Sequence, residues 1–219
     1  PQRRADNEDT QQAAAAEAGM GGRWRVVVDH RRPRRFCGVA MAAAGGELGW
    51  CQAATDHADQ RRAENDGGEG HDDFGGDDLN DVLNLIPLAD EIPQANKDVL
   101  GIEGWSRGGM MTYLTLTKTN IFKAAVVLGG IANLRCNSDE SKFMRRLYEH
   151  TIGRYGEEEF KSRCETRSIV NFPEKLSKTT PMLIIHGNAD NRVLPHDSLD
   201  LSYKLLELKI PYRLVMLEG

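Results

Sequence analysis

The chain reads VLGIEGWSRGGMMTYLTLTKT from Val99 to Thr119. This stretch opens with a short apolar run, which predicts a buried strand over Val99–Glu103. From Arg107 onward, two methionines and a leucine recur at helical spacing, which predicts a helix as far as Thr119. The residues between them, Gly104 to Ser106, must therefore form a tight turn from strand to helix, with a serine directly before the helix.

The segment Gly104-Trp105-Ser106-Arg107-Gly108 has the G-x-S-x-G pattern of a nucleophile elbow, in the strand–turn–helix context that such an elbow requires. Side chains at Gly104 and Gly108 would collide with the strand and the helix, so both positions must be small. The Ser106 hydroxyl would then stand at the carboxyl edge of a sheet, and the backbone N–H of Arg107 is the expected first donor to an oxyanion. The alternative is an ordinary turn in which the serine caps the helix.

A second polar stretch, HGNADNRV from His186 to Val193, follows a buried strand and precedes a helix. Asp190 is the candidate acid that would orient a catalytic histidine and hold its tautomer. Ser106 lies 84 positions before Asp190, and the order of serine and then aspartate is the one that α/β-hydrolases use. The alternative for Asp190 alone is a turn or helix-capping aspartate.

Apolar runs alternate with helical patterns along the rest of the chain. Continuous apolar strands separated by helices indicate an α/β fold, with a mostly parallel sheet and helices on both faces. In the last helix we expect Leu199, Leu201, Leu205, Leu206 and Leu208 to cover much of one side. The expected elements are a helix from Asp77 or Asp78, strands at Ala124–Leu128, Met182–His186 and Tyr212–Leu217, a helix at Leu199–Leu208, and a charged helical insertion between Asn133 and Arg167.

Residues 1–66 differ in composition from residues 67–219. They contain no Lys, Ile or Tyr, and their ten Arg offset ten acidic residues, so the net charge of −5 lies wholly in the second part. Only Trp24–Val28 resembles a strand and only Val39–Ala44 a short apolar segment. We therefore expect residues 1–66 to be irregular, either because they are disordered or because the gene model assigns them wrongly to this protein. Residues 67–219 are expected to form a partial domain.

Composition excludes several classes of protein. A net charge of −5 is not typical of a nucleic-acid-binding surface, and no apolar run reaches the roughly 18 residues that a membrane-spanning helix needs. The cysteines form no C-x-x-C pair, so neither a zinc site nor a dense disulfide framework is indicated. We expect no metal, no organic cofactor, and neither a nucleic-acid nor a membrane partner. With no export signal visible, we expect a cytoplasmic location; the alternative is a secreted protein whose signal peptide is missing from this fragment.

From about Gly70 to Gly219 the sequence resembles the catalytic domain of prolyl oligopeptidase-type serine peptidases, which have an α/β-hydrolase fold. The resemblance rests on Phe74–Leu79 (FGGDDL), on the elbow, on the stretch around Asp190 and on Tyr212–Gly219. It implies a partial α/β-hydrolase fold and hydrolysis of peptide bonds through an acyl-enzyme. Ser106 would be the nucleophile, the aspartate its triad acid, and a peptide or oligopeptide the substrate.

The sequence also departs from the family pattern. The family's catalytic histidine follows the strand equivalent to Tyr212–Leu217, shortly after a Glu-Gly pair, and this chain stops at Gly219 within that pair. His186 matches the family's His-Gly pair at a strand end, which implies a structural role. A second oxyanion donor, a tyrosine upstream of the glycine-rich loop, has no counterpart. Because loss of a triad member lowers kcat by a factor of ~10⁴ to 10⁶, the resemblance implies that this fragment is inactive or nearly so.

Two other functions stay open at this level. A carboxylesterase-type or dienelactone-hydrolase-like enzyme would use the same chemistry at Ser106, so the elbow does not distinguish such enzymes from a peptidase. A non-catalytic pseudohydrolase that binds a partner or a peptide is the third interpretation, and the missing histidine favours it. Subsite preference, exopeptidase or endopeptidase action and oligomeric state cannot be read from these residues.

Overall fold

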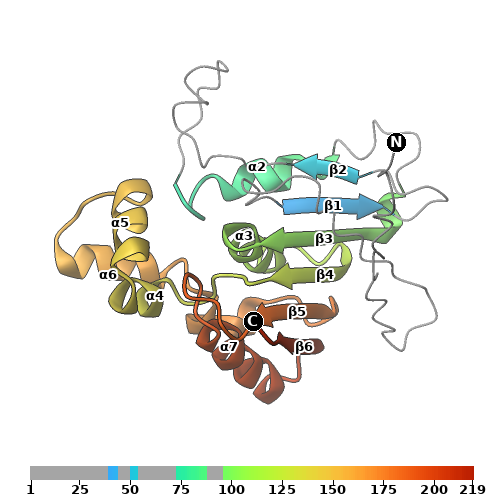
Figure 1. Cartoon of the computed structure of the whole chain (residues 1–219). Coiled ribbons are helices and arrows are strands. Elements are labelled where there is room, and N and C mark those ends of the chain that lie inside the picture. Colours follow the sequence, from blue (N-terminus) through green and yellow to red (C-terminus); the bar gives the residue numbers. More distant parts are fainter. Residues whose placement is uncertain (1–38, 44–49, 54–72, 88–95) are drawn as a thin grey trace, which may run out of the picture. The chain divides into compact units, whose positions relative to one another are not determined.

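A computed structural model describes residues 39–43, 50–53, 73–87 and 96–219 (Figure 1). All of them fall within one unit, Phe36–Gly219. The elements in chain order are β1 (Val39–Ala43), β2 (Trp50–Ala53), α2 (Leu79–Asn84), η2 (Lys97–Val99), β3 (Leu100–Trp105), α3 (Arg107–Leu116), β4 (Phe122–Leu128), α4 (Leu134–Glu140), α5 (Lys142–Thr151), α6 (Glu157–Glu165), η3 (Ile169–Asn171), η4 (Pro173–Lys175), β5 (Met182–Gly187), α7 (His196–Glu207) and β6 (Tyr212–Leu217), where η marks a 3-10 helix.

The sheet has the strand order β2-β1-β3-β4-β5-β6 (Figure 1). Strands β3 to β6 run parallel, whereas β1 pairs antiparallel with both β2 and β3. Parallel neighbours need a crossover between them, and α3, the segment from α4 to η4, and α7 provide the three crossovers in turn. The prediction of an α/β fold with a mostly parallel sheet is confirmed.

The register of the parallel strands brings the ends of β3, β4 and β5 level with one another. Trp105 pairs with Leu128, and Leu128 pairs with Ile185. The segments that follow these strands therefore emerge at one edge of the sheet. They are the elbow after β3, the loop that begins at Gly129 after β4, and the loop that carries Asp190 after β5.

Helix α3 lies in the centre of the core. It packs against β3 and β4, and each of its ten residues is buried. Met110, Met111 and Leu114 face inward as predicted, but the helix has no exposed side at all. Burial alternates along β3 and β5, where every second residue is buried and the others are half-buried, except for the exposed Trp105 at the end of β3. One face of the sheet is therefore covered more completely than the other.

Helix α7 begins at His196, three residues earlier than predicted. Leu201 and Leu205 are buried, but Leu206 is 64% exposed. The prediction that five leucines share one buried side is wrong. At about 100° per residue, positions 199 and 206 point away from position 201, and position 208 lies beyond the last helical residue. Of these five leucines, the exposed ones are Leu199, Leu206 and Leu208.

Strands β1 and β2 come from the segment that composition set apart. The short apolar segment predicted at Val39–Ala44 is a strand, and it pairs directly with β3. Over β1 and β2 the chain is therefore regular, although the composition predicted an irregular segment. The strand predicted at Trp24–Val28 lies outside the described residues.

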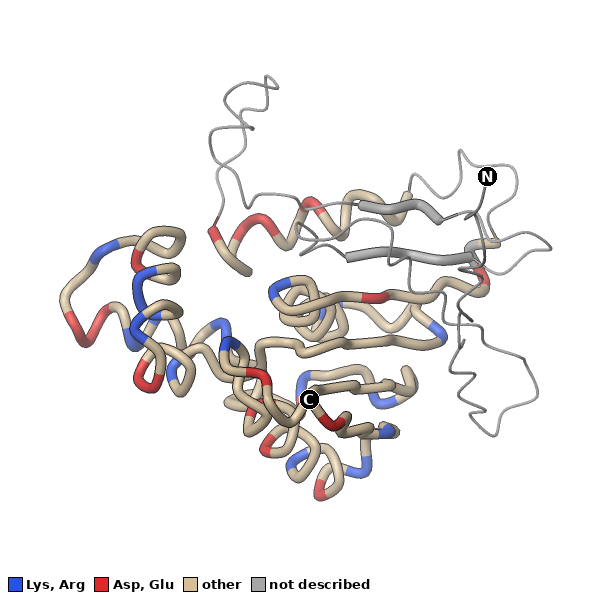
Figure 2. The backbone as a smooth tube through the Cα atoms, in the orientation of Figure 1, with Lys and Arg blue, Asp and Glu red and all other residues tan. Residues whose placement is uncertain are grey.

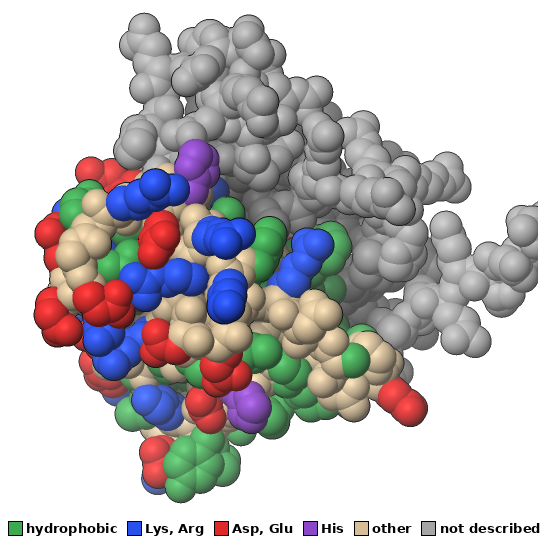
Figure 3. Space-filling model, turned by 60° about the vertical axis from the view of Figure 1, so that its left-hand side comes forward, with side chains coloured by type: hydrophobic (Ala, Val, Ile, Leu, Met, Phe, Trp, Pro, Cys, Tyr) green, Lys and Arg blue, Asp and Glu red, His purple; other side chains and the backbone are tan. Residues whose placement is uncertain are grey.

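Charged residues are frequent on the insertion formed by α4, α5 and α6 and scarce on the inner strands (Figure 2). Figure 3 brings this side forward and shows positive and negative side chains interspersed over it. Arg145 pairs with Glu149 and Glu157, and Arg135 pairs with Glu165, each at 2.7 Å. Within the described ranges, no helix combines the length and the apolar character that crossing a membrane requires.

Candidate active site

Ser106 has a strained backbone conformation at the point where β3 ends and α3 begins. Its φ of 55° and ψ of −115° lie in a region that residues with a side chain seldom adopt. Strand and helix approach closely here, because a Cβ on Gly104 would collide with the carbonyl of Gly108. The turn therefore has the shape of a nucleophile elbow, and glycine at position 104 is a steric requirement.

Hydrogen bonds and a close backbone contact join the elbow to the strand β4 and the loop after it. The N–H of Ser106 donates to the carbonyl of Leu128 at 2.9 Å, and the N–H of Ile131 donates to the carbonyl of Ser106 at 3.3 Å. A Cβ on Gly109 would lie 2.6 Å from the Cα of Gly130, so α3 and this loop are in close backbone contact. The serine is thus held at the carboxyl edge of the sheet.

Asp190 lies at the same edge, in the loop between β5 and α7. Its Oδ1 accepts hydrogen bonds from the N–H groups of Arg192 at 2.9 Å and Val193 at 3.0 Å, which closes a tight turn. Its Oδ2 lies 3.5 Å from the position that a Cβ on Gly129 would take, and Nε1 of Trp105 lies 3.9 Å from that same position. One carboxylate oxygen therefore faces the loop after β4, close to the residue that precedes the elbow serine.

The ring of His186 is buried, and both of its nitrogens are engaged. Nε2 donates to the carbonyl of Val193 at 2.9 Å, and Nδ1 is hydrogen-bonded to Oγ of Ser198 at 2.7 Å. Nε2 also lies 3.8 Å from Oδ2 of Asp190. The imidazole therefore ties the Asp190 loop to β5 and α7, which agrees with the structural role that the resemblance implied for it.

A buried ion pair lies directly beside the elbow, and the sequence analysis did not predict it. The guanidinium of Arg107 contacts Oδ2 of Asp78 at 2.7 Å and lies 4.7 Å from the centre of the Phe74 ring. Asp78 also accepts a hydrogen bond from the N–H of Gly75 at 2.9 Å. The sequence analysis assigned the acids at positions 77 and 78 to the start of α2. Asp78 does precede that helix, but its side chain makes no capping hydrogen bond there.

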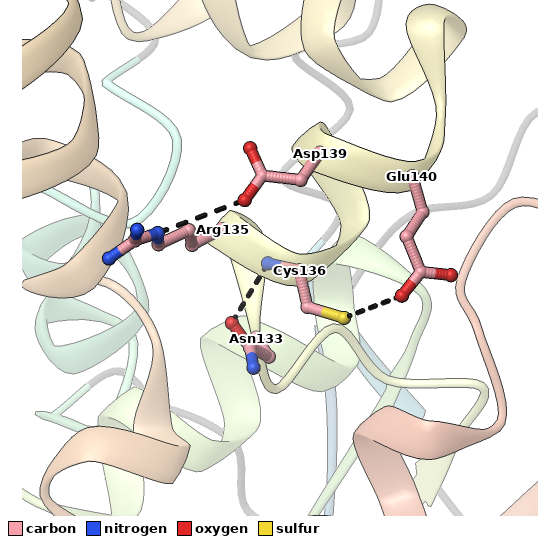
Figure 4. Close-up of a pocket in the computed structure, with 5 residues that line it drawn as sticks. All are labelled: Asn133, Arg135, Cys136, Asp139 and Glu140. Carbon is pink, nitrogen blue, oxygen red and sulfur yellow. Dashed lines mark hydrogen bonds and ion pairs between the residues drawn. The ribbon is translucent and has the colours of Figure 1, made fainter.

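A hollow of about 330 Å³ lies beside α4, and neither Ser106 nor Asp190 lines it (Figure 4). The thiol of Cys136 donates to Oε1 of Glu140 at 3.3 Å. Burial, this hydrogen bond and nearby carboxylates raise the pKa of Cys136 to about 12, so the thiol is not a nucleophile at neutral pH. The lining residues are Asn133, Arg135, Cys136, Asp139 and Glu140.

The family model for the prolyl oligopeptidase family matches residues 67–219, which is more than half of the chain. The chain belongs to the prolyl oligopeptidase family. Among its relatives, the uncharacterized peptidase YtmA of Bacillus subtilis is 32% identical over 151 residues, which cover 67% of this chain and 56% of the relative. The uncharacterized peptidase YuxL of the same organism is 33% identical over 125 residues, 55% of this chain and 18% of the relative. The chain thus spans 56% or less of the length of these peptidases.

Solved structures agree with this assignment to the prolyl oligopeptidase family. A puromycin-hydrolyzing peptidase of Mycobacterium tuberculosis has a TM-score of 0.60 and 27% identity, covering 67% of this chain and 22% of that chain. An acylaminoacyl peptidase of Pyrococcus horikoshii has a TM-score of 0.61 and 25% identity, covering 68% and 24%. The described part is therefore a partial α/β-hydrolase fold, as the sequence predicted.

Proposed function

We propose that this chain carries the nucleophile and the acid of a serine-type peptidase, Ser106 and Asp190. The observation that supports this most directly is the strained backbone of Ser106, at the edge of the sheet where the Asp190 carboxylate also lies. Strain of this kind is characteristic of functional sites, where it holds a reacting group in place. Membership of a peptidase family supports peptides as the proposed substrate class.

In the proposed reaction, Oγ of Ser106 attacks the carbonyl carbon of a peptide bond. A histidine base takes the hydroxyl proton and passes it to the leaving amine, which leaves an ester on the serine that water then hydrolyses. The N–H of Arg107, the first residue of α3, is proposed to donate to the oxyanion, while its side chain is held by Asp78. Oδ2 of Asp190, the oxygen that its own loop does not bind, would orient the imidazole.

The described histidines do not include a good candidate for that base. Both ring nitrogens of His186 are already bonded within the fold, and His150 and His196 are exposed on α5 and at the start of α7. A serine hydroxyl without a base is a weak nucleophile. We therefore propose that these 219 residues alone react slowly at Ser106. The same observation favours a second candidate function, a peptide-binding pseudohydrolase.

A phosphonofluoridate probe tests this proposal directly. We expect it to label Ser106, identified by peptide mass spectrometry, and not the Ser106→Ala variant. Free imidazole should raise the labelling rate at least 10-fold, because it supplies a base, and Asp190→Asn should reduce that gain. The matched control is Ser162→Ala, which removes an exposed hydroxyl on α6 and should change nothing.

The proposal fails if, with imidazole present, Ser106 is labelled no faster than Ser162. Labelling that is fast without imidazole would overturn only the claim of slow reaction. A peptide amide and an ester with the same acyl group then separate a peptidase from a carboxylesterase, since only the peptidase also cleaves the amide. Binding of the peptide without cleavage, in the presence of imidazole, would favour the pseudohydrolase.

A further inference from the structure

The buried carboxylate of Asp197 contacts the loop that supports the elbow. Asp197 lies in the first turn of α7 and is 1% exposed. Its Oδ2 accepts hydrogen bonds from the N–H groups of Ala132 at 2.7 Å and Asn133 at 2.9 Å. Directly before them, the N–H of Ile131 donates to the carbonyl of Ser106. The carboxylate thus fixes the same loop that holds the elbow from the β4 side.

Asn137, on α4, connects Asp197 to the loop that carries Asp190. Its Nδ2 lies 2.9 Å from both oxygens of Asp197, and its Oδ1 accepts a hydrogen bond from the N–H of Leu194 at 3.1 Å. Leu194 directly follows Val193, whose N–H donates to Asp190. A route of hydrogen bonds and neighbouring residues therefore joins the elbow to the proposed acid. In order it runs Ser106, Ile131, Ala132, Asp197, Asn137, Leu194, Val193, Asp190.

The chemistry of this junction explains why an aspartate stands there. Three donors converge on the carboxylate, namely two backbone N–H groups and the amide of Asn137. An ionised carboxylate only accepts hydrogen bonds, so it can satisfy all three donors at once. An asparagine at position 197 would bring a fourth donor into the cluster. Because burying a carboxylate is costly, a purely space-filling role would be served better by an apolar residue.

We propose that Asp197, acting with Asn137, is a positioning residue that sets the Asp190 loop relative to the Ser106 elbow. This inference rests on the proposed roles of Asp190 and Ser106. Asp197 itself touches neither of them and acts through the two loops.

The charge of Asp197 offers a way to observe this coupling. Burial raises the pKa of Asp197 to about 7, and Asp200 on the same helix adds to the rise, whereas the three N–H donors oppose it. The other ionisable groups that face it are Cys136 on α4, Tyr113 on α3 and Tyr148 on α5, and its charge contributes to a raised pKa at each of them. Protonation weakens the carboxylate as an acceptor, so the loops it binds should respond near neutral pH.

A pH titration of the ¹⁵N-labelled chain, followed by amide NMR, tests the inference without any catalytic readout. We expect the amides of Ala132 and Asn133 to shift with one midpoint near pH 7. The amides of Arg192 and Val193, which report on Asp190, should shift with the same midpoint. The measurement therefore distinguishes failure of this inference from failure of the proposed function, because it reads loop geometry whether or not Ser106 reacts.

Two variants sharpen the result. Asp197→Asn should remove the shared transition at both loops, whereas Asp200→Asn, at an exposed position on the same helix, should keep the transition and lower its midpoint. A shared midpoint in the wild-type chain supports the inference even if Asp197→Asn does not fold. If Ala132 and Asn133 titrate while Arg192 and Val193 do not follow at that midpoint, Asp197 is only a structural anchor and the inference is wrong. The inference is also wrong if folded Asp197→Asn still shows the pH transition at the amides of Arg192 and Val193.

Discussion

The elbow and the helical insertion hold their shapes by different means. At the elbow, backbone lies against backbone, all of α3 is buried, and a Cβ on Gly104 has no room. The insertion has a buried part too, which includes Tyr148 and Phe160. On its surface, partly exposed charged side chains add ion pairs, such as those of Arg145 with Glu149 and Glu157. The guanidinium of Arg145 also lies 4.0 Å from the centre of the Phe160 ring.

The two regions differ in how strongly their stability depends on single atoms. Close packing transmits a change of one methyl group, because the neighbours have no space into which to move. Exposed ion pairs are screened by water and salt, and each contributes little. The elbow should therefore lose much of its stability on a single substitution, whereas loss of the surface ion pairs of the insertion should lower stability in small, nearly additive steps.

The largest effect is expected from adding one methyl group to the elbow. Gly104→Ala should lower the free energy of unfolding by about 3 kcal/mol or more, because the new Cβ meets the carbonyl of Gly108. Gly156→Ala is the matched control, since a Cβ there meets nothing within 4 Å and the backbone φ is −61°. Its effect should stay within about 0.5 kcal/mol in a urea titration. Similar losses in the two variants would contradict the steric account of the elbow.

The buried ion pair beside the elbow should rank second. Asp78→Asn removes a carboxylate that lies 2.7 Å from Arg107 in the protein interior, and we expect a loss of about 3 kcal/mol. Glu159→Gln breaks a half-exposed pair with Arg163 in the insertion and should cost less than about 1 kcal/mol. Chemical denaturation of both variants checks this ratio. Equal losses of unfolding free energy would mean that burial does not make the ion pair beside the elbow more important than a pair on the insertion.

The raised pKa of Asp197 predicts how the free energy of unfolding depends on pH. Its pKa is about 7 in the fold and about 3.9 in an unfolded chain, so between these values the folded state binds more protons. Stability from this group is therefore fully present below pH 4 and is lost as pH rises toward 7, by about 2 kcal/mol between pH 5 and 7. Asp197→Asn should remove this slope, as read from unfolding curves at both pH values. If the variant keeps the pH dependence of the wild-type chain, other ionisable groups must cause it.

The smallest effect belongs to a single exposed pair of the insertion. Arg135 and Glu165 lie 2.7 Å apart, and both are about half exposed. A double-mutant cycle with Arg135→Gln and Glu165→Gln should give a coupling energy of about 0.5 kcal/mol. In 1 M salt the Debye length falls to about 3 Å, so the coupling should nearly vanish. A coupling energy above about 2 kcal/mol that does not change in 1 M salt would contradict this expectation, because only a buried pair should behave in that way.

The sequence predicted the parallel part of the fold because its signals are local. Apolar runs bounded by glycine marked β4 and β5, and β6 has the predicted bounds, Tyr212–Leu217. The exposed leucines of α7 were mispredicted, because a leucine-rich pattern does not show which side meets the sheet. The pairing of β1 with β3 was also missed, since a five-residue run of small apolar residues carries little information about its partner.

At the candidate site, the sequence motifs predicted which residues lie there, but not the contacts that hold them in place. Ser106 and Asp190 were singled out because a turn of fixed geometry and a fixed chain order constrain the residue types. The Asp78–Arg107 pair and the contacts of Asp197 join residues 29 and 60 to 65 positions apart. Acids at these two places also fit ordinary helix starts, so no local signal separated them from exposed carboxylates.

The backbone of Ser106 has one more consequence. Its positive φ suits glycine, so Ser106→Gly should fold more stably than Ser106→Ala by about 1 kcal/mol, although both lack the hydroxyl. A chain retained only for its architecture would gain from that replacement. The serine therefore stands where its backbone conformation would suit glycine better, and this supports the proposed role of its hydroxyl.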